Sequence, residues 1–94
     1  MADDAYNFTD QTYEYLAKAG MAPLAVTDVL HGSPTVRRHI GSSLQIAGQD
    51  RTGVWLVVAL VEGANDDEYT VTGARYLDDS ELEIITRLIG KEER

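Results

Sequence analysis

The chain contains a long uninterrupted apolar run, Val54–Val61, that constrains the fold more than any other stretch. It is too short to cross a bilayer as a helix, which takes about 20 apolar residues, and its valine content favours a buried strand. Alternate residues of a strand point to opposite faces, so Trp55 and Val57 share one face, opposite Leu56. Because both faces are apolar, we expect a central strand with one face on the core and a second face that is either covered or left partly exposed.

Length and composition limit the classes of protein to which this chain can belong. A length of 94 residues predicts one domain, and the lack of cysteine excludes disulfides, thiolate zinc sites and a cysteine nucleophile. The acidic start, residues 1–4, has no apolar segment of the kind that directs secretion, so we expect a cytoplasmic protein. The sequence has no phosphate-binding, metalloprotease or hydrolase motif, so we expect no metal and no cofactor.

The charge is strongly negative but unevenly distributed. The formal net charge of -8 opposes binding to nucleic acid by the protein as a whole. Yet no acidic residue occurs from Val29 to Gln49, a window that contains Arg37, Arg38 and His39. This window is either a local cationic patch or an ordinary solvated strand edge, and charge runs are more often solvated faces.

Two short helices are predicted before the strands. After a frayed lead-in over residues 1–7, Thr9 is placed to cap the first helix, with Phe8 and Tyr13 as a hydrophobic staple across its start. The second helix is expected over Pro23–His31, because proline suits the first helical turn.

Four strands and a third helix follow. Gly73 inside the last strand predicts a bulge or a close backbone approach. Asp78 and Glu81 have the spacing of a capping box, which starts a helix that we expect to end at Gly90. The strands are expected at Val36–Ile40, Leu44–Gly48, Val54–Val61 and Tyr69–Leu77, and the core stripe of the helix at Leu82, Ile85, Leu88 and Ile89.

This order of elements predicts an α+β protein. Short loops between the strands favour an antiparallel four-stranded meander with helices packed on it, in the order α-α-β-β-β-β-α. The domain is expected to span residues 8–90, followed by a solvated tail at 91–94.

One group of side chains has the composition of a catalytic site. Arginines beside a histidine can cleave a phosphodiester without metal, because histidine moves a proton while arginine stabilises charge on the phosphorane. The candidates are Arg37, Arg38, His39, Arg51 and Arg75. For His39 the alternative is an exposed residue on an edge strand, and for Arg75 it is a structural ion pair with Asp78 or Glu81. Spacing alone favours both alternatives.

Several local sequences match those of a known family. Lys18–Gly20 stands where that family often closes its first helix with Lys-His-Gly, and Val71–Arg75 is similar to its Ile-Ser-Ala-Arg strand. The likeness also includes Arg38-His39, the segment Leu44–Gly48 and the apolar run. Over about Phe8 to Ile89 the chain thereby resembles BrnT-type toxins and related members of the RelE-like superfamily, which are ribonuclease toxins of bacterial type II toxin–antitoxin systems.

The resemblance implies metal-independent RNA cleavage on a RelE-like fold. The catalytic residues that it implies are Lys18, Arg38, His39 and Arg75, and charge adds Arg37 and Arg51 beside Arg38 as RNA-binding residues. It also implies a cognate antitoxin as partner, for which a second copy of the chain is the alternative. In either case the partner is expected to cover the face that carries Trp55 and Val57, and no membrane is involved.

The chain also departs from the family. Ala19 stands where the family's histidine is common, and the last helix, Asp79–Gly90, is acidic and apolar where such toxins often carry arginines. These departures predict weakened nuclease activity. The alternative, from another class, is a non-catalytic protein-interaction module on the same fold.

Overall fold

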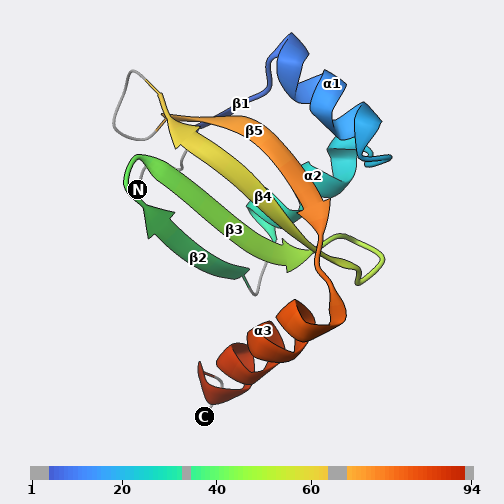
Figure 1. The fold of residues 1–94 in the computed structure, drawn as a ribbon, viewed down its shortest axis with the longest axis vertical. Helices are drawn as coiled ribbons and strands as arrows, with labels where there is room; N and C mark the ends of the chain where they lie inside the picture. Colours follow the sequence, from blue (N-terminus) through green and yellow to red (C-terminus); the bar gives the residue numbers. More distant parts are fainter. Residues whose placement is uncertain (1–4, 33–34, 64–67, 93–94) are drawn as a thin grey trace.

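The centre of the fold is a five-stranded sheet (Figure 1), seen in a computed structural model that describes residues 5–32, 35–63 and 68–92. The spatial order of the strands is β1-β5-β4-β3-β2, and the apolar run forms β4, with a neighbour on each side. The α+β class is as expected from the sequence. Within the described residues the strands are β1 (Ala5–Asn7), β2 (Thr35–Ile40), β3 (Ser43–Gln49), β4 (Trp55–Glu62) and β5 (Glu68–Tyr76), and the helices are α1 (Asp10–Lys18), α2 (Pro23–His31) and α3 (Asp79–Glu92).

Strands β2 to β5 form the predicted antiparallel meander, but the sheet has a fifth strand that the sequence did not predict. Residues 5–7, expected to be a frayed lead-in, form β1, which runs parallel to β5 with Tyr6 level with Tyr69. The ring of Tyr6 also lies edge-on to that of His31, with centroids 5.9 Å apart. Three residues are too few to show an alternating pattern, so the pairing with β5 and the packing of Tyr6 define this strand.

Helix α1 begins as the sequence predicts. Thr9 is the N-cap, and its hydroxyl accepts a hydrogen bond from the Thr12 amide at 3.2 Å. The Thr12 hydroxyl accepts from the Thr9 amide at 3.0 Å, which completes a capping box. Phe8 and Tyr13 form the predicted staple, with ring centroids 5.8 Å apart. Thr12 is buried and its hydroxyl donates to the Val71 carbonyl at 2.5 Å, so the start of α1 is tied to β5.

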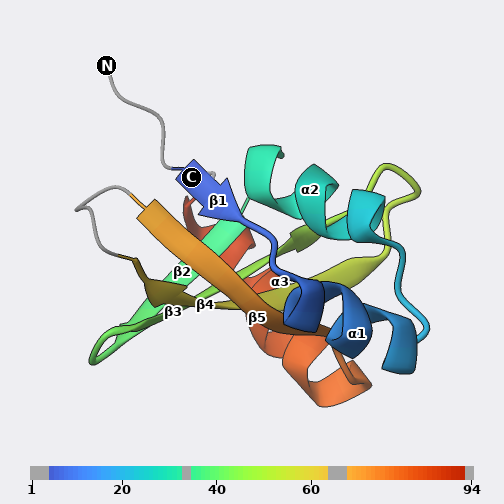
Figure 2. The ribbon, with the colours of Figure 1, turned by 90° about the horizontal axis from the view of Figure 1, so that it is seen from above.

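Helices α1 and α2 cover one face of the sheet, and the hydrophobic core lies between them and the strands (Figure 2). Side chains from both layers are fully shielded from water, which makes this interface the main source of hydrophobic stabilisation. The core residues are Leu16, Met21, Val26 and Val29 from the helices and their connection, and Leu44, Ile46, Leu56, Val58, Leu60, Tyr69 and Val71 from the strands.

Helix α3 lies on the other side of the sheet, beyond the end of β5 (Figures 1 and 2). It continues to Glu92, past the predicted end at Gly90, because a glycine inside a helix costs only about 1 kcal/mol relative to alanine. The predicted core stripe is only partly correct: Leu82 and Ile85 are half-buried, whereas Leu88 is 44% exposed. The side chain of Ile89, which was expected in the same stripe, and the end of the predicted tail, residues 93–94, lie outside the described part of the structure.

Candidate functional site

The candidate site lies on the sheet face opposite α1 and α2, which we call the open face. Two rows of paired residues cross four adjacent strands on this face. One row consists of Val36, Ala47, Val57 and Arg75, and the other of Arg38, Gln45, Ala59 and Gly73. The β4 side chains on this face, Trp55 to Val61 at alternate positions, are all partly exposed. Of the two alternatives that the sequence left open for the second face of the central strand, covered or partly exposed, the structure has the partly exposed one.

A bulge in β5 decides which side chains reach the open face. Leu60 is level with Val71 and Ala59 with Gly73, so Thr72 is an extra residue, as Gly73 had suggested. The Thr72 hydroxyl donates to the Ala59 carbonyl at 3.1 Å. Without the extra residue, strict alternation from Val71 would direct Arg75 to the core face. The bulge thus places Arg75 on the open face.

A hollow of about 240 Å³ lies between the open face and α3. Apolar side chains from both sides form most of its lining, and two arginines, a glutamine and a glutamate supply its polar part. The lining residues are Val36, Arg38, Gln45, Ala47, Val57, Arg75, Leu77, Glu81, Ile84, Ile85 and Leu88. Among the described side chains of α3, the most exposed apolar one is Ile84, at 59%, and it lines this hollow. The hollow therefore presents apolar surface to solvent.

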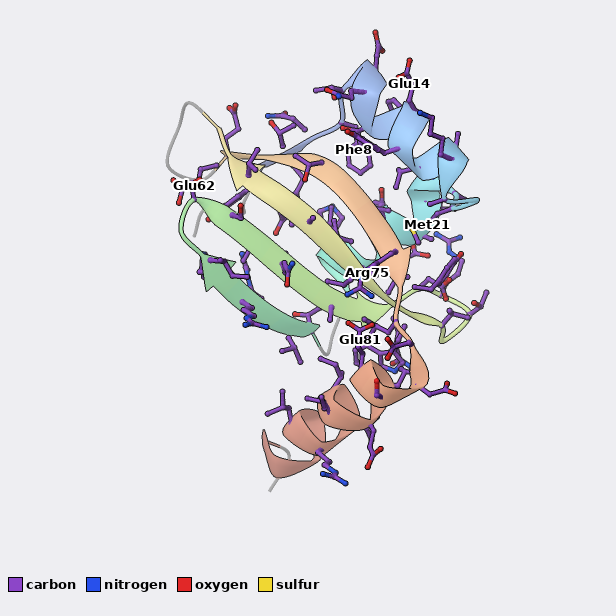
Figure 3. The ribbon with its side chains drawn as sticks, in the orientation of Figure 1. Phe8, Glu14, Met21, Glu62, Arg75 and Glu81 are labelled. Atoms are coloured by element: carbon purple, nitrogen blue, oxygen red, sulfur yellow. The ribbon has the colours of Figure 1, made fainter. Side chains whose placement is uncertain are left out.

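The start of α3 is held against β5 by an ion pair. Arg75 donates from its two terminal nitrogens to the two carboxylate oxygens of Glu81, at 2.7 and 2.6 Å. Glu81 also accepts from the Asp78 amide at 3.1 Å, and the Asp78 carboxylate accepts from the Glu81 amide at 2.9 Å, which is the predicted capping box. Figure 3 shows Arg75 and Glu81 side by side at the junction of β5 and α3. One carboxylate thus serves both the cap and the ion pair.

These contacts change the acidity of Glu81. The hydrogen bonds from Arg75, followed by the amide of Asp78, lower the pKa of Glu81 from its ordinary value of 4.5 to about 2. Glu81 is consequently ionised at neutral pH and neutralises the charge of Arg75. Because Arg75 is largely solvent-exposed, this ion pair orients α3 more than it stabilises the fold.

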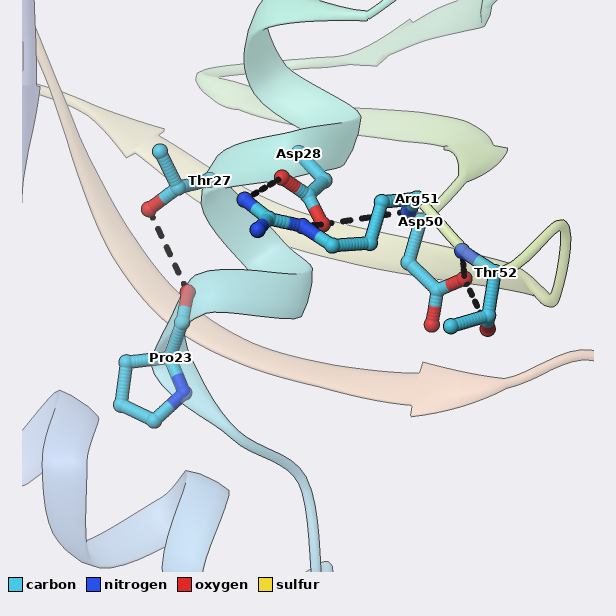
Figure 4. A network of polar contacts seen from close by, with 6 residues as sticks. All are labelled: Pro23, Thr27, Asp28, Asp50, Arg51 and Thr52. Atoms are coloured by element: carbon cyan, nitrogen blue, oxygen red, sulfur yellow. Dashed lines mark hydrogen bonds and ion pairs between the residues drawn. The ribbon is translucent and has the colours of Figure 1, made fainter.

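A second bidentate ion pair lies on the helix-covered side (Figure 4). Arg51, in the β3–β4 loop, donates from its side chain to both oxygens of Asp28 of α2, at 3.1 and 3.0 Å. Its backbone amide also donates to Asp28, at 3.1 Å. These hydrogen bonds lower the pKa of Asp28. Arg51 therefore holds the β3–β4 loop against α2, and it does not add to the positive charge of Arg37 and Arg38 on β2.

The structure distributes the four residues that the resemblance implied as catalytic over three places: two share the hollow, one lies on the other face of β2 and one lies on α1. Arg38 and Arg75 face the same hollow, whereas His39 and Arg37 point to the other face of β2. His39 is exposed on an edge strand and Arg75 is paired with Glu81, so both structural alternatives from the sequence are confirmed. Lys18 lies in the last turn of α1, the helix that packs on the opposite face.

Some residues of the hollow were not predicted as site residues. Gln45 lies level with Arg38, and Ile84 was outside the predicted core stripe. The alternation of β3 could have indicated Gln45, since Leu44 and Ile46 are inward. For Ile84 no local signal exists, because its exposure depends on how far α3 stands from the sheet.

Over residues 5–32, 35–63 and 68–92 no cluster of three metal-binding side chains is found. Within the same residues no helix is long and apolar enough to cross a membrane.

Comparisons with protein-family models, with curated proteins and with solved structures give no match to this chain. The function must therefore be argued from the geometry of the open face.

Proposed function

We propose that the protein is a non-catalytic protein-interaction module on a RelE-like sheet, and that it binds its partner through the open face. The observation that carries this proposal is the partly exposed apolar surface that Val57, Ile84 and Leu88 form in the hollow, with Trp55 partly exposed on the same face of β4. A contiguous exposed apolar surface on a small domain is typical of an interface. The order of α1, α2, the meander and α3 supports the RelE-like assignment, because it is the order that the resemblance implies.

The charges of the candidate residues also favour binding over catalysis. Glu81 neutralises Arg75 and Asp28 neutralises Arg51, so neither arginine presents an uncompensated charge to a phosphate. Arg38 and His39 alternate to opposite sides of β2, which places the presumed proton carrier away from the hollow. Catalysis would require both groups to reach one phosphate.

A matched pair of surface variants tests the binding surface. Ile84→Asp places a charge in the hollow, while Leu24→Asp makes the same change on α2, where Leu24 is 52% exposed. With the product of the adjacent gene as the probe, calorimetry should detect binding to the wild type and to Leu24→Asp, and a loss of at least tenfold in affinity for Ile84→Asp. Equal affinity for the two variants would contradict the proposal.

A BrnT-like or RelE-like ribonuclease toxin with weakened activity is the second candidate. Its specific support is that Arg38 and Arg75 line one hollow, where a phosphate could meet both guanidinium groups. It predicts that expression in a bacterial host arrests growth, and that Arg75→Ala or His39→Ala relieves the arrest. The interaction module predicts normal growth and intact RNA after incubation with the purified protein.

A further inference from the structure

Two polar side chains lie together at the β2 end of the hollow. Arg38 of β2 is directly opposite Gln45 of β3, and both line the hollow. Among the described residues, neither side chain forms a hydrogen bond or an ion pair. The side chains of such cross-strand neighbours start about 5 Å apart, so the guanidinium and the amide can donate to one anion. A carboxylate suits this pair, because it accepts charge-assisted hydrogen bonds from a guanidinium.

The charges at the other end of the hollow are already compensated. Arg75 donates to both oxygens of Glu81, and these hydrogen bonds, with a smaller contribution from the charge of Asp78, raise the pKa of Arg75. One cation therefore stands against two carboxylates at the start of α3, where a further anion is repelled. Over the lining of the whole hollow, two arginines face one glutamate, so one positive charge remains. That charge belongs to Arg38.

Glu81 does not neutralise Arg38, because the sheet keeps the two ends of the hollow apart. Arg38 lies on β2 and Arg75 on β5, three strand spacings away, which amounts to about 14 Å between the two strands. That separation exceeds the Debye length, which is about 8 Å at physiological salt. Within the described part of the chain, no ion pair joins Arg38 to Glu81. The hollow is therefore cationic at β2 and slightly acidic at the start of α3.

The middle of the hollow is apolar and has room for one large side chain. Val57 of the sheet faces this space together with Ile84 and Leu88 of α3, and the volume is about 240 Å³. In another protein, an apolar cavity of about 150 Å³ holds a benzene molecule. A whole helix, about 10–12 Å across, needs more room than this. The hollow therefore accepts a single aromatic or large aliphatic side chain, which is the usual anchor of a protein interface.

We propose that the partner protein inserts one aromatic or large aliphatic side chain between the sheet and α3, and that a neighbouring carboxylate of the partner binds Arg38 and Gln45. The inference rests on the proposed interaction function and adds the chemistry of the partner's anchor. In an extended segment, residues two positions apart point to the same side, so the acid is expected two residues from the anchor.

The net charge limits the partner further. At -8 the protein repels a strongly acidic segment, so the partner is expected to bring a single carboxylate to the hollow. The same charge opposes a second copy of the chain as the occupant. Two acids of α3 do not add to the repulsion, because Glu81 is paired with Arg75 and Glu83 with Arg87.

The probe is the peptide Ser-Glu-Gly-Phe-Ser, capped at both ends so that the glutamate carries its only charge. Titrated into the intact chain, it should shift the methyl NMR signals of Val57, Ile84 and Leu88 and the side-chain amide signals of Gln45, while the signals of α1 stay unchanged. Alanine in place of its phenylalanine should weaken binding about tenfold or more, because the buried ring supplies most of the affinity. Glutamine in place of its glutamate should weaken binding by up to about fivefold, the effect of one exposed ion pair.

Two matched variants of the protein test the cationic end. Arg38→Gln and Arg87→Gln remove the same group, but Arg87 is 74% exposed on α3, paired with Glu83, and is not part of the lining of the hollow. Arg38→Gln should bind the glutamate and glutamine peptides equally, and both should still shift the methyl signals, which shows that the hollow is intact. Arg87→Gln should keep the preference for glutamate.

Three results would overturn the proposal: no shift in the hollow with millimolar peptide, equal binding of the glutamate and glutamine peptides to the wild type, or self-association of the protein through the hollow. If one of these occurs while Ile84→Asp still abolishes binding of the adjacent-gene product, the open face remains an interface and only the anchor proposal is lost. If Ile84→Asp leaves that product bound while the peptide fills the hollow with its preference for glutamate, the proposed function fails and the anchor site stands.

Discussion

The two faces of the sheet carry helices in contrasting ways. On one face, α1 and α2 pack through fully buried side chains such as Leu16, Val26 and Val29. On the open face, α3 leaves Ile84 and Leu88 largely exposed and is fastened at its start by Arg75 and Glu81. Both regions use an arginine–carboxylate ion pair, but only the first also has an apolar interface of fully buried side chains.

This contrast shows what each interaction accomplishes. Burial of apolar surface stabilises the fold and is not directional, whereas a bidentate ion pair on the surface fixes an orientation and contributes little stability. The α1–α2 layer is therefore the structural half of the protein. On the other side, the ion pair fixes the orientation of α3 but leaves apolar side chains of the hollow exposed to solvent. Such a surface can exchange its contact with water for contact with a partner.

The largest expected effect comes from core truncation on the structural side. Leu16→Ala should lower the free energy of unfolding by about 2–5 kcal/mol, because it removes a completely buried side chain and leaves a cavity. Leu88→Ala should cost about 1 kcal/mol or less, since its side chain is 44% exposed. Urea unfolding followed by circular dichroism measures both. Equal losses would mean that α3 packs as tightly as α1.

A smaller effect is expected from the tie between α1 and β5. Thr12→Val keeps the shape of the side chain but removes the hydroxyl that bonds the Val71 carbonyl and the Thr9 amide. Leaving the buried Val71 carbonyl without this partner should cost about 1–3 kcal/mol of unfolding free energy. The control is Thr27→Val on α2: the Thr27 hydroxyl donates to the Pro23 carbonyl at 3.3 Å in a solvent-exposed hydrogen bond, so its loss should change stability much less. A neutral Thr12→Val would show that the capping box contributes nothing.

The smallest effect concerns the ion pair of α3. The folded pKa of Glu81, about 2, lies below its ordinary value of 4.5, so its contribution to stability is complete above about pH 4.5 and is lost as the pH falls through about 2. In Arg75→Gln, NMR titration of the Glu81 carboxyl should give a pKa closer to 4.5, and the amide protons of α3 should exchange faster. The pKa of Asp28, which Arg51 lowers, should stay unchanged. An unaltered Glu81 pKa would assign the effect to the helix cap instead.

Much of the local structure could be predicted because its causes lie close together in the sequence. Thr9 caps α1, Asp78 and Glu81 form their capping box, and Gly73 marks the bulge. Each depends on residues a few positions apart or on one backbone preference. The separation of Arg38 from His39 was also readable, because neighbouring residues of a strand point to opposite faces. Grouping them as one catalytic site followed the chemistry of arginine beside histidine, and then the resemblance, against that rule.

The sequence by itself determined the α+β class, the central position of β4 and the caps of α1 and α3, because apolar runs and capping residues act over short distances. Tertiary structure decided the rest. Residues 5–7 become β1 only because β5 offers them a free edge, and Ile84 stays exposed only because α3 is held at its first turn and not along its length. Both outcomes depend on contacts between distant segments, and such contacts have no local pattern.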